Sequence, residues 1–94
     1  MISVLYVDDE QNLLDIGKIF LEKCGHFSVD TITSAHGALS LIQSKNYDAI
    51  VSDYQMPDMD GIEFLREIRG SGNTIPFILF TGRGREEVVI QALN

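Results

Sequence analysis

Cysteine, tryptophan and basic side chains are scarce in this sequence of 94 residues, which has one cysteine, no tryptophan and 7 lysine or arginine residues against 14 acids. The single cysteine, Cys24, excludes an internal disulfide and indicates a reducing compartment, and we expect it to be a small buried side chain. The net charge of −7 argues against nucleic acid or an anionic membrane as the partner, because both would repel the chain. No apolar run approaches the roughly 18 residues that span a membrane, so we expect a cytoplasmic protein.

The chain does contain a repeated alternation of apolar, strand-like runs and amphipathic helices. Strands are predicted over residues 2–7, 28–33, 49–52 and 77–80. Helices are predicted over residues 11–24, 35–42, 62–68 and 85–94. The apolar stripe of the first helix consists of Leu13, Ile16, Gly17, Phe20 and Cys24. This alternation predicts one α/β domain, a parallel sheet with right-handed crossovers and helices on both faces.

Polar side chains follow three of the predicted strands at the point where each strand ends. Asp8 and Asp9 follow the first, Asp53 follows the third and Thr81 follows the fourth. Parallel sheets bind ligands beyond the carboxyl ends of their strands, where the strand order reverses. One acid at such a place is commonly only the cap of the next helix, and Asp9 or Glu10 would serve as one.

Caps alone do not explain two neighbouring strands that both end in carboxylates with no basic residue beside them. Two charges ~5 Å apart repel by roughly 3 kcal/mol at an effective dielectric constant of about 20. A raised pKa or a bound cation relieves this repulsion, and Mg²⁺ accepts carboxylate ligands and bridges them to phosphate. We therefore interpret Asp53 as a nucleophile that accepts a phosphoryl group, with the Thr81 hydroxyl donating to a phosphoryl oxygen.

Three stretches resemble the receiver domain of two-component response regulators: VLYVDDE, DAIVSDYQMPDMDGIEFL and IPFILFTG. The resemblance covers the whole chain and implies a flavodoxin-like, doubly wound fold with strand order 2-1-3-4-5. It implies that Asp53 is the phosphoacceptor and Thr81 the switch hydroxyl. Mg²⁺ would be bound by Asp9 directly, by Asp8 largely through water, by Asp53 and by the backbone carbonyl of Gln55. The implied phosphodonor is a sensor histidine kinase, and the downstream effector is not identified.

Two further residues are expected to shape the loop before the third helix. Pro57 fixes its φ angle, and Gly61 is expected to tolerate unusual backbone angles. His26 and His36 lie in other segments, and we interpret both as surface histidines rather than metal ligands.

Family members usually continue through a fifth strand and helix, and they carry a lysine at the end of that strand. We therefore expect residues 1–94 to be a C-terminally incomplete receiver domain with strand order 2-1-3-4, in which strand 5 and helix 5 are absent. The outer edge of strand 4 would then be unpaired. We expect either a fragment of a longer chain or a homodimer formed through strand 4 or helix 4.

Two other functions are weighed against a phosphoacceptor, which is a signalling module rather than an enzyme. A pseudo-receiver would bind partners without phosphorylation, but the intact set of Asp8, Asp9, Asp53 and Thr81 argues against it. Magnesium-dependent aspartyl phosphatases of the haloacid dehalogenase type carry an Asp-x-Asp pattern on the first strand. Here the corresponding residues, Asp8-Asp9-Glu10, give Asp-x-Glu instead, which argues against a phosphatase of this type.

Overall fold

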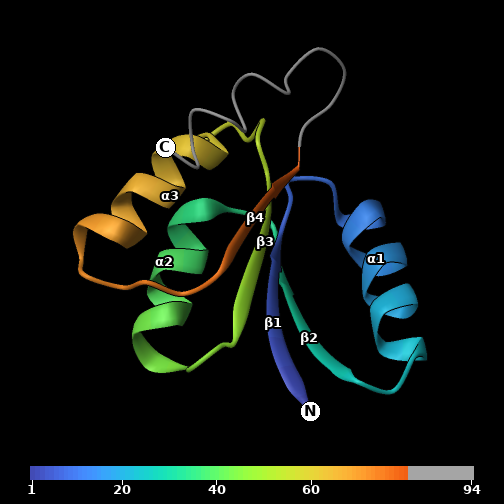
Figure 1. Cartoon of the computed structure of the whole chain (residues 1–94). Helices are drawn as coiled ribbons and strands as arrows, with labels where there is room; N and C mark the ends of the chain where they lie inside the picture. Colours follow the sequence, from blue (N-terminus) through green and yellow to red (C-terminus); the bar gives the residue numbers. More distant parts are fainter. Residues whose placement is uncertain (81–94) are drawn as a thin grey trace.

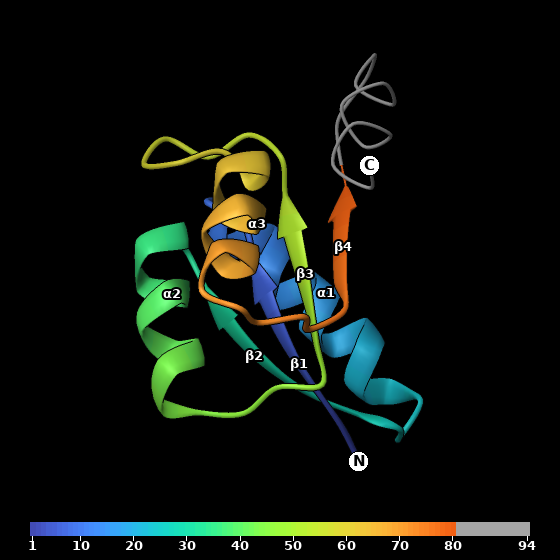
Figure 2. The ribbon, with the colours of Figure 1, turned by 60° about the vertical axis from the view of Figure 1, so that its left-hand side comes forward.

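The computed structural model describes residues 1–80, which form a sheet with helices on both of its faces (Figure 1). The elements in chain order are β1 (Ile2–Val7), α1 (Gln11–Lys23), β2 (Phe27–Ile32), α2 (Ala35–Ser44), β3 (Ala49–Asp53), α3 (Gly61–Gly70) and β4 (Phe77–Phe80). The strands lie in the order β2-β1-β3-β4, and every pairing is parallel. Helices α2 and α3 cover one face of the sheet and α1 covers the other (Figure 2).

This arrangement confirms the predicted flavodoxin-like fold with strand order 2-1-3-4. Strands β1 and β4 have the predicted bounds, whereas β2 begins and ends one residue earlier and β3 continues through Asp53. The helix predicted over residues 85–94 lies outside the described residues. No helix within residues 1–80 is long and apolar enough to cross a bilayer.

The main core lies between the sheet and helices α2 and α3. Side chains alternate along a strand, so Leu5 and Val7 of β1 point to the same face and join Ile50 of β3 in this core. Phe64 of α3 is fully buried, and its ring meets that of Phe77 edge-on, with 5.6 Å between ring centres. The other buried members of the cluster are Ala35, Ala38, Met56 and Ile68.

Helix α1 packs chiefly on β2 and buries only Leu14 of its own residues. The apolar stripe predicted for this helix includes Leu13, Ile16 and Phe20, and all three are exposed, Phe20 by 71%. Cys24 is exposed as well, so the expectation of a buried cysteine is wrong. The reason is its place as the C-cap residue, one position beyond the last turn of α1, where its thiol donates to a backbone carbonyl at 3.2 Å.

Local contacts hold the loop between β3 and α3. Asp60 is the N-cap of α3: its carboxylate accepts a hydrogen bond from the Glu63 N–H at 2.8 Å, and the Glu63 carboxylate accepts one from the Asp60 N–H at 3.2 Å. A Cβ atom at Gly61 would lie 2.5 Å from the carbonyl oxygen of Asp53. Gly61 does not have a positive φ, so the expectation of unusual backbone angles is wrong. Glycine is required there because no space exists for a side chain.

Candidate functional site

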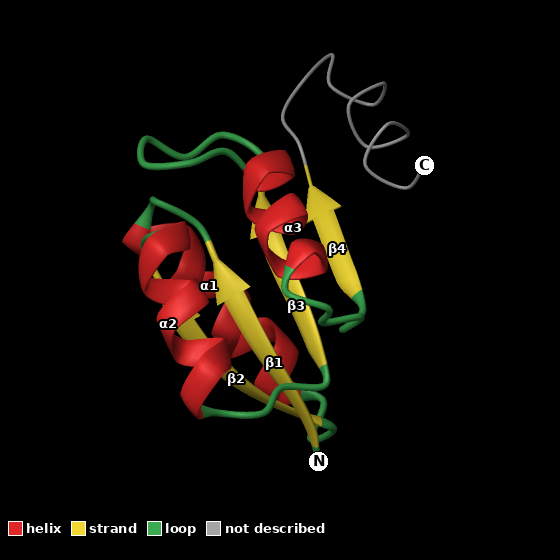
Figure 3. Ribbon diagram, turned by 90° about the vertical axis from the view of Figure 1, so that its left-hand side faces the viewer, coloured by secondary structure: helices red, strands yellow, loops and turns green. Residues whose placement is uncertain are grey.

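Three carboxylates meet at the carboxyl end of the sheet, the end to which the arrows of β1 and β4 point in Figure 3. Asp8 and Asp9 follow β1 directly, and Asp53 is the last residue of the neighbouring strand β3. Val7 pairs with Ser52 in the register of these two strands, so the residues that follow them, Asp8 and Asp53, lie side by side. One oxygen atom from each side chain lies within 4.8 Å of the other two. The structure therefore brings together the three acids that the sequence analysis selected.

Asp8 is the most deeply buried of the three, with 1% of its surface exposed. Its Oδ1 atom accepts a hydrogen bond from the Glu10 N–H at 2.9 Å. Its Oδ2 atom is buried and has no hydrogen-bond partner among the described residues. A buried carboxylate oxygen without a partner is costly unless a cation or a proton compensates its charge. The donor set of three clustered carboxylates therefore fits a hard divalent cation such as Mg²⁺.

Burial raises the pKa of Asp8, and the negative charges of Asp53 and Asp9 raise it further against the opposing hydrogen bond from the Glu10 N–H. Burial also raises the pKa of Asp53, and the charges of Asp9 and Glu10 add to this effect. The backbone N–H groups of the two residues after Asp53 oppose the shift. Because these carboxylates disfavour one another's charge, a cation placed among them would be bound favourably.

An open cleft of about 440 Å³ adjoins the acids. Its lining residues are Asp9, Glu10, Asp53, Gln55, Met56 and Pro57. Gln55, whose backbone carbonyl was expected to bind the metal, therefore lies at the rim of the same cleft as Asp9 and Asp53. Thr81, the expected switch residue, lies outside the described residues. The cleft is open to solvent, so a phosphate-bearing molecule can approach Asp53 from this side.

A contact that the sequence does not predict connects the loop after β3 to the start of α2. Asp58 Oδ2 accepts a hydrogen bond from the His36 N–H and contacts the His36 Nδ1 atom, both at 2.9 Å. Burial raises the pKa of Asp58, but the two hydrogen bonds from His36, together with those from the backbone N–H groups of Met59 and of Asp58 itself, outweigh it, so the net shift is downward. His36 is exposed, as expected, yet it is not isolated. The two residues are 22 positions apart, and no local sequence signal relates them.

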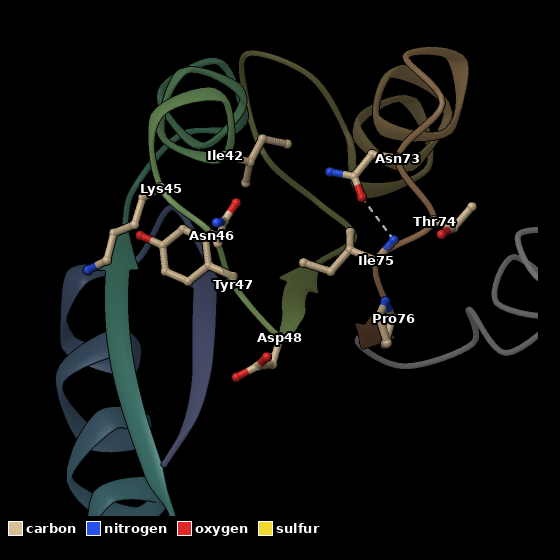
Figure 4. Close-up of a pocket in the computed structure, with 9 residues that line it drawn as sticks. All are labelled: Ile42, Lys45, Asn46, Tyr47, Asp48, Asn73, Thr74, Ile75 and Pro76. Carbon is tan, nitrogen blue, oxygen red and sulfur yellow. Dashed lines mark hydrogen bonds between the residues drawn. The ribbon is translucent and has the colours of Figure 1, made fainter.

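A second pocket, of about 360 Å³, lies at the opposite end of the strands from the acids (Figure 4). It opens between the α2–β3 and α3–β4 connections, at the amino-terminal ends of β3 and β4. Its lining residues are Ile42, Lys45, Asn46, Tyr47, Asp48, Asn73, Thr74, Ile75 and Pro76. Two of them bind Asp30 of β2, which accepts hydrogen bonds from the Tyr47 hydroxyl, at 2.6 Å, and from the Lys45 ammonium. These bonds lower the pKa of Asp30 and connect the α2–β3 segment to β2.

The Tyr47 hydroxyl makes the stability of the chain depend on pH in the alkaline range. Burial, the hydrogen bond to Asp30 and the charge of that carboxylate raise the pKa of Tyr47 from 10.0 to about 12. The folded chain therefore favours the neutral phenol, and this stabilisation is complete below pH 10 and lost as the pH rises towards about 12. We expect a Tyr47→Phe variant to lose less unfolding free energy than the parent between pH 10 and about 12, as measured by denaturant unfolding at a series of pH values. Equal losses in the parent and in the variant would contradict the assignment.

Residues 4–94 match the model of the response regulator receiver domain family. Among curated proteins, the chain is 38% identical over 94 residues to the response regulator SaeR of Staphylococcus aureus. The alignment covers all of this chain and 40% of SaeR. The chain thus spans less than half the length of the curated relatives that it matches.

Solved structures show the same likeness. The receiver domain of the Francisella response regulator 1452 has a TM-score of 0.91 at 31% identity, over 99% of this chain and 76% of that one. The response regulator TrrA of Thermotoga maritima, solved in complex with Mg²⁺-BeF, has a TM-score of 0.86 at 32% identity, over 98% of this chain and 81% of that one. The parallel sheet and the carboxylates at the ends of its strands agree with this likeness. The chain belongs to the response regulator receiver domain family of two-component systems, whose general property is phosphorylation on an aspartate.

Proposed function

We propose that this chain accepts a phosphoryl group on Asp53 from a phosphohistidine of a sensor histidine kinase, in the presence of Mg²⁺. One observation carries the proposal: three carboxylates converge at the end of the sheet, and a buried oxygen of Asp8 lacks a hydrogen-bond partner among the described residues. A purely structural set of caps would not leave such an oxygen unpaired. On this proposal the chain is a cytoplasmic signalling module, and its receiver domain comprises residues 1–94.

Asp8, Asp9 and Asp53 would hold the metal together with the backbone carbonyl of Gln55, which borders the same cleft. Bound there, Mg²⁺ supplies positive charge for the oxygens of the transferring phosphoryl group. Asp53 differs from the other two acids in its position. It is half-buried at the end of an interior strand and lines the open cleft, so its carboxylate can meet a phosphorus atom that enters from solvent.

The response to phosphorylation is proposed to begin at the end of β4. Phe80, its last residue, is the register partner of Asp53, and its carbonyl accepts a hydrogen bond from the Tyr54 N–H at 3.0 Å. Thr81 follows Phe80 directly in the chain, which supports its proposed role as the switch hydroxyl. A phosphoryl group adds about −1.5 to −2 charges and strong acceptors beside this strand end. The Thr81 hydroxyl would move towards the phosphoryl group, and the resulting change in the surface near the end of β4 would be recognised by a downstream effector.

The proposed homodimer rests on the outer edge of β4. Among residues 1–80 this strand is the last in the sheet order, and Ile78 near its centre is 58% exposed. An edge strand with an exposed apolar side chain can pair with a second copy. The alternative contact, through helix 4, involves residues outside the described part of the chain.

The test is incubation with Mg²⁺ and a small acyl phosphate, followed by intact-mass measurement. We expect one added phosphoryl group, which is lost when EDTA replaces Mg²⁺ and in the Asp53→Asn variant. Asp48→Asn is the matched control, because Asp48 is exposed and lies at the amino-terminal end of β3, away from the three acids. Labelling that survives in Asp53→Asn would refute the assignment of the acceptor. Steady release of inorganic phosphate over many turnovers would instead favour a phosphatase.

A further inference from the structure

The ring of Tyr6 fills the space that a side chain at position 17 would need. A Cβ atom built on Gly17 would lie 2.3 Å from Cε2 of Tyr6 and 3.2 Å from its hydroxyl oxygen. Gly17 lies in the interior of α1, where glycine is less favourable than alanine. The helix is therefore locally less stable at Gly17, where the tyrosine ring lies against its backbone.

The same ring contacts the end of β4. The ring centres of Tyr6 and Phe80 are 6.0 Å apart, with the rings inclined at 70° in an edge-on arrangement. Tyr6 pairs in register with Val51, and Phe80 pairs with Asp53, so all four side chains point to the face of the sheet that α1 covers. The tyrosine ring thus reaches from β1, across β3, to the register partner of the proposed phosphoacceptor.

We propose that Tyr6 is a positioning residue that couples the state of Asp53 to the end of β4, and that Gly17 is the residue whose small size permits it. The inference rests on the proposed function of Asp53. Phe80 immediately precedes Thr81, so a movement of Thr81 towards a phosphoryl group pulls on Phe80. Phe80 is half-buried, and the Tyr6 ring occupies its side towards β1, so a shift in that direction requires Tyr6 to repack or to separate from it. The edge-on contact, supported from behind by α1, therefore opposes the shift.

The packing half of the inference is tested by a double-mutant cycle that does not involve phosphorylation. In the parent chain, we expect Gly17→Ala to lower the unfolding free energy, because the new methyl group meets the tyrosine ring. In a Tyr6→Val background, the same change is expected to raise it, because alanine favours the helix. Gly70→Ala is the matched control: it lies in α3, no atom lies within 4 Å of its added Cβ, and its effect should be the same in both backgrounds.

The functional half is tested with beryllium fluoride and Mg²⁺ as a phosphoryl mimic. Coupling between two sites is reciprocal, so a contact that opposes the shift also weakens binding of the mimic. We expect Tyr6→Leu to raise the affinity for the mimic by about five-fold or more, and Tyr6→Phe, which keeps the ring, to match the parent. The affinity for Mg²⁺ alone should not change. The NMR signals of the Phe80 ring should move on binding, and by different amounts in Tyr6→Leu.

Each outcome separates the two proposals. If the parent chain does not bind the mimic, or if Asp53→Asn binds it equally well, the proposed function fails. If the parent binds it through Asp53 but Tyr6→Leu has the parent's affinity, the coupling is refuted and the proposed function stands. A Gly17→Ala variant that gains as much stability as Gly70→Ala in the parent chain would also refute the role of the ring.

Discussion

Replacing Asp8 by asparagine is expected to stabilise the chain in the absence of metal and to weaken its binding of Mg²⁺. Asparagine keeps an oxygen that can accept the hydrogen bond from the Glu10 N–H, seen here at 2.9 Å. It removes a buried negative charge whose second oxygen has no partner among residues 1–80. Removing this buried, uncompensated charge should raise the unfolding free energy by about 1–3 kcal/mol when EDTA is present.

The same substitution removes part of the charge that attracts the cation. Asp8 was expected to act on the metal largely through water, and the loss of such an outer contact lowers metal affinity by roughly 10–100-fold. The measurements are denaturant unfolding with and without Mg²⁺ and a calorimetric titration with Mg²⁺. Asp48→Asn is again the control, since its carboxylate is exposed and accepts a hydrogen bond from the Ser3 N–H at 2.7 Å. An Asp8→Asn chain that is less stable than the parent in EDTA would contradict the electrostatic account of the site.

Phe64→Ala is expected to cause the largest loss of stability among single substitutions in the core. Phe64 is fully buried, and its ring lies 5.6 Å from that of Phe77 between α3 and the sheet. Removing a buried phenylalanine side chain costs about 3–5 kcal/mol, because the surroundings collapse only partly into the cavity. Domains of this size are stable by only about 5–15 kcal/mol, so the loss is a large share of the total.

The matched control is Phe20→Ala on α1, which makes the same chemical change at a side chain that is 71% exposed. Its expected effect is within about 0.5 kcal/mol, as for other surface positions. Both variants are compared with the parent by urea unfolding, and the slope of the transition shows whether each variant still unfolds cooperatively. Similar losses at the two positions would mean that the core does not lie between α3 and the sheet.

Three acids of one loop and strand end illustrate why residue type alone does not assign a role. Asp53 faces the cleft, Asp58 binds His36 at the start of α2, and Asp60 caps α3. All three follow the same apolar run in the sequence. Their separate roles depend on the direction in which each side chain leaves the backbone and on which neighbour lies within hydrogen-bond distance.

The sequence by itself determined the order of the elements and the edge of the sheet at which the acids gather. Both follow from local physics: apolar residues repeat with the period of a helix or a strand, and residues that end parallel strands share one edge. For this reason the bounds of β1 and β4 and the convergence of Asp8 with Asp53 were predictable from short stretches.

Only the tertiary structure decided what each side chain meets. It left Cys24 and the α1 stripe exposed, it joined His36 to Asp58 across 22 positions, and it left no space for a side chain at Gly61. It also placed the ring of Tyr6 between α1 and β4. These contacts depend on how elements that are distant in the chain pack against one another. Periodicity shows which face of an element is apolar, but it does not show which neighbour covers that face or how closely.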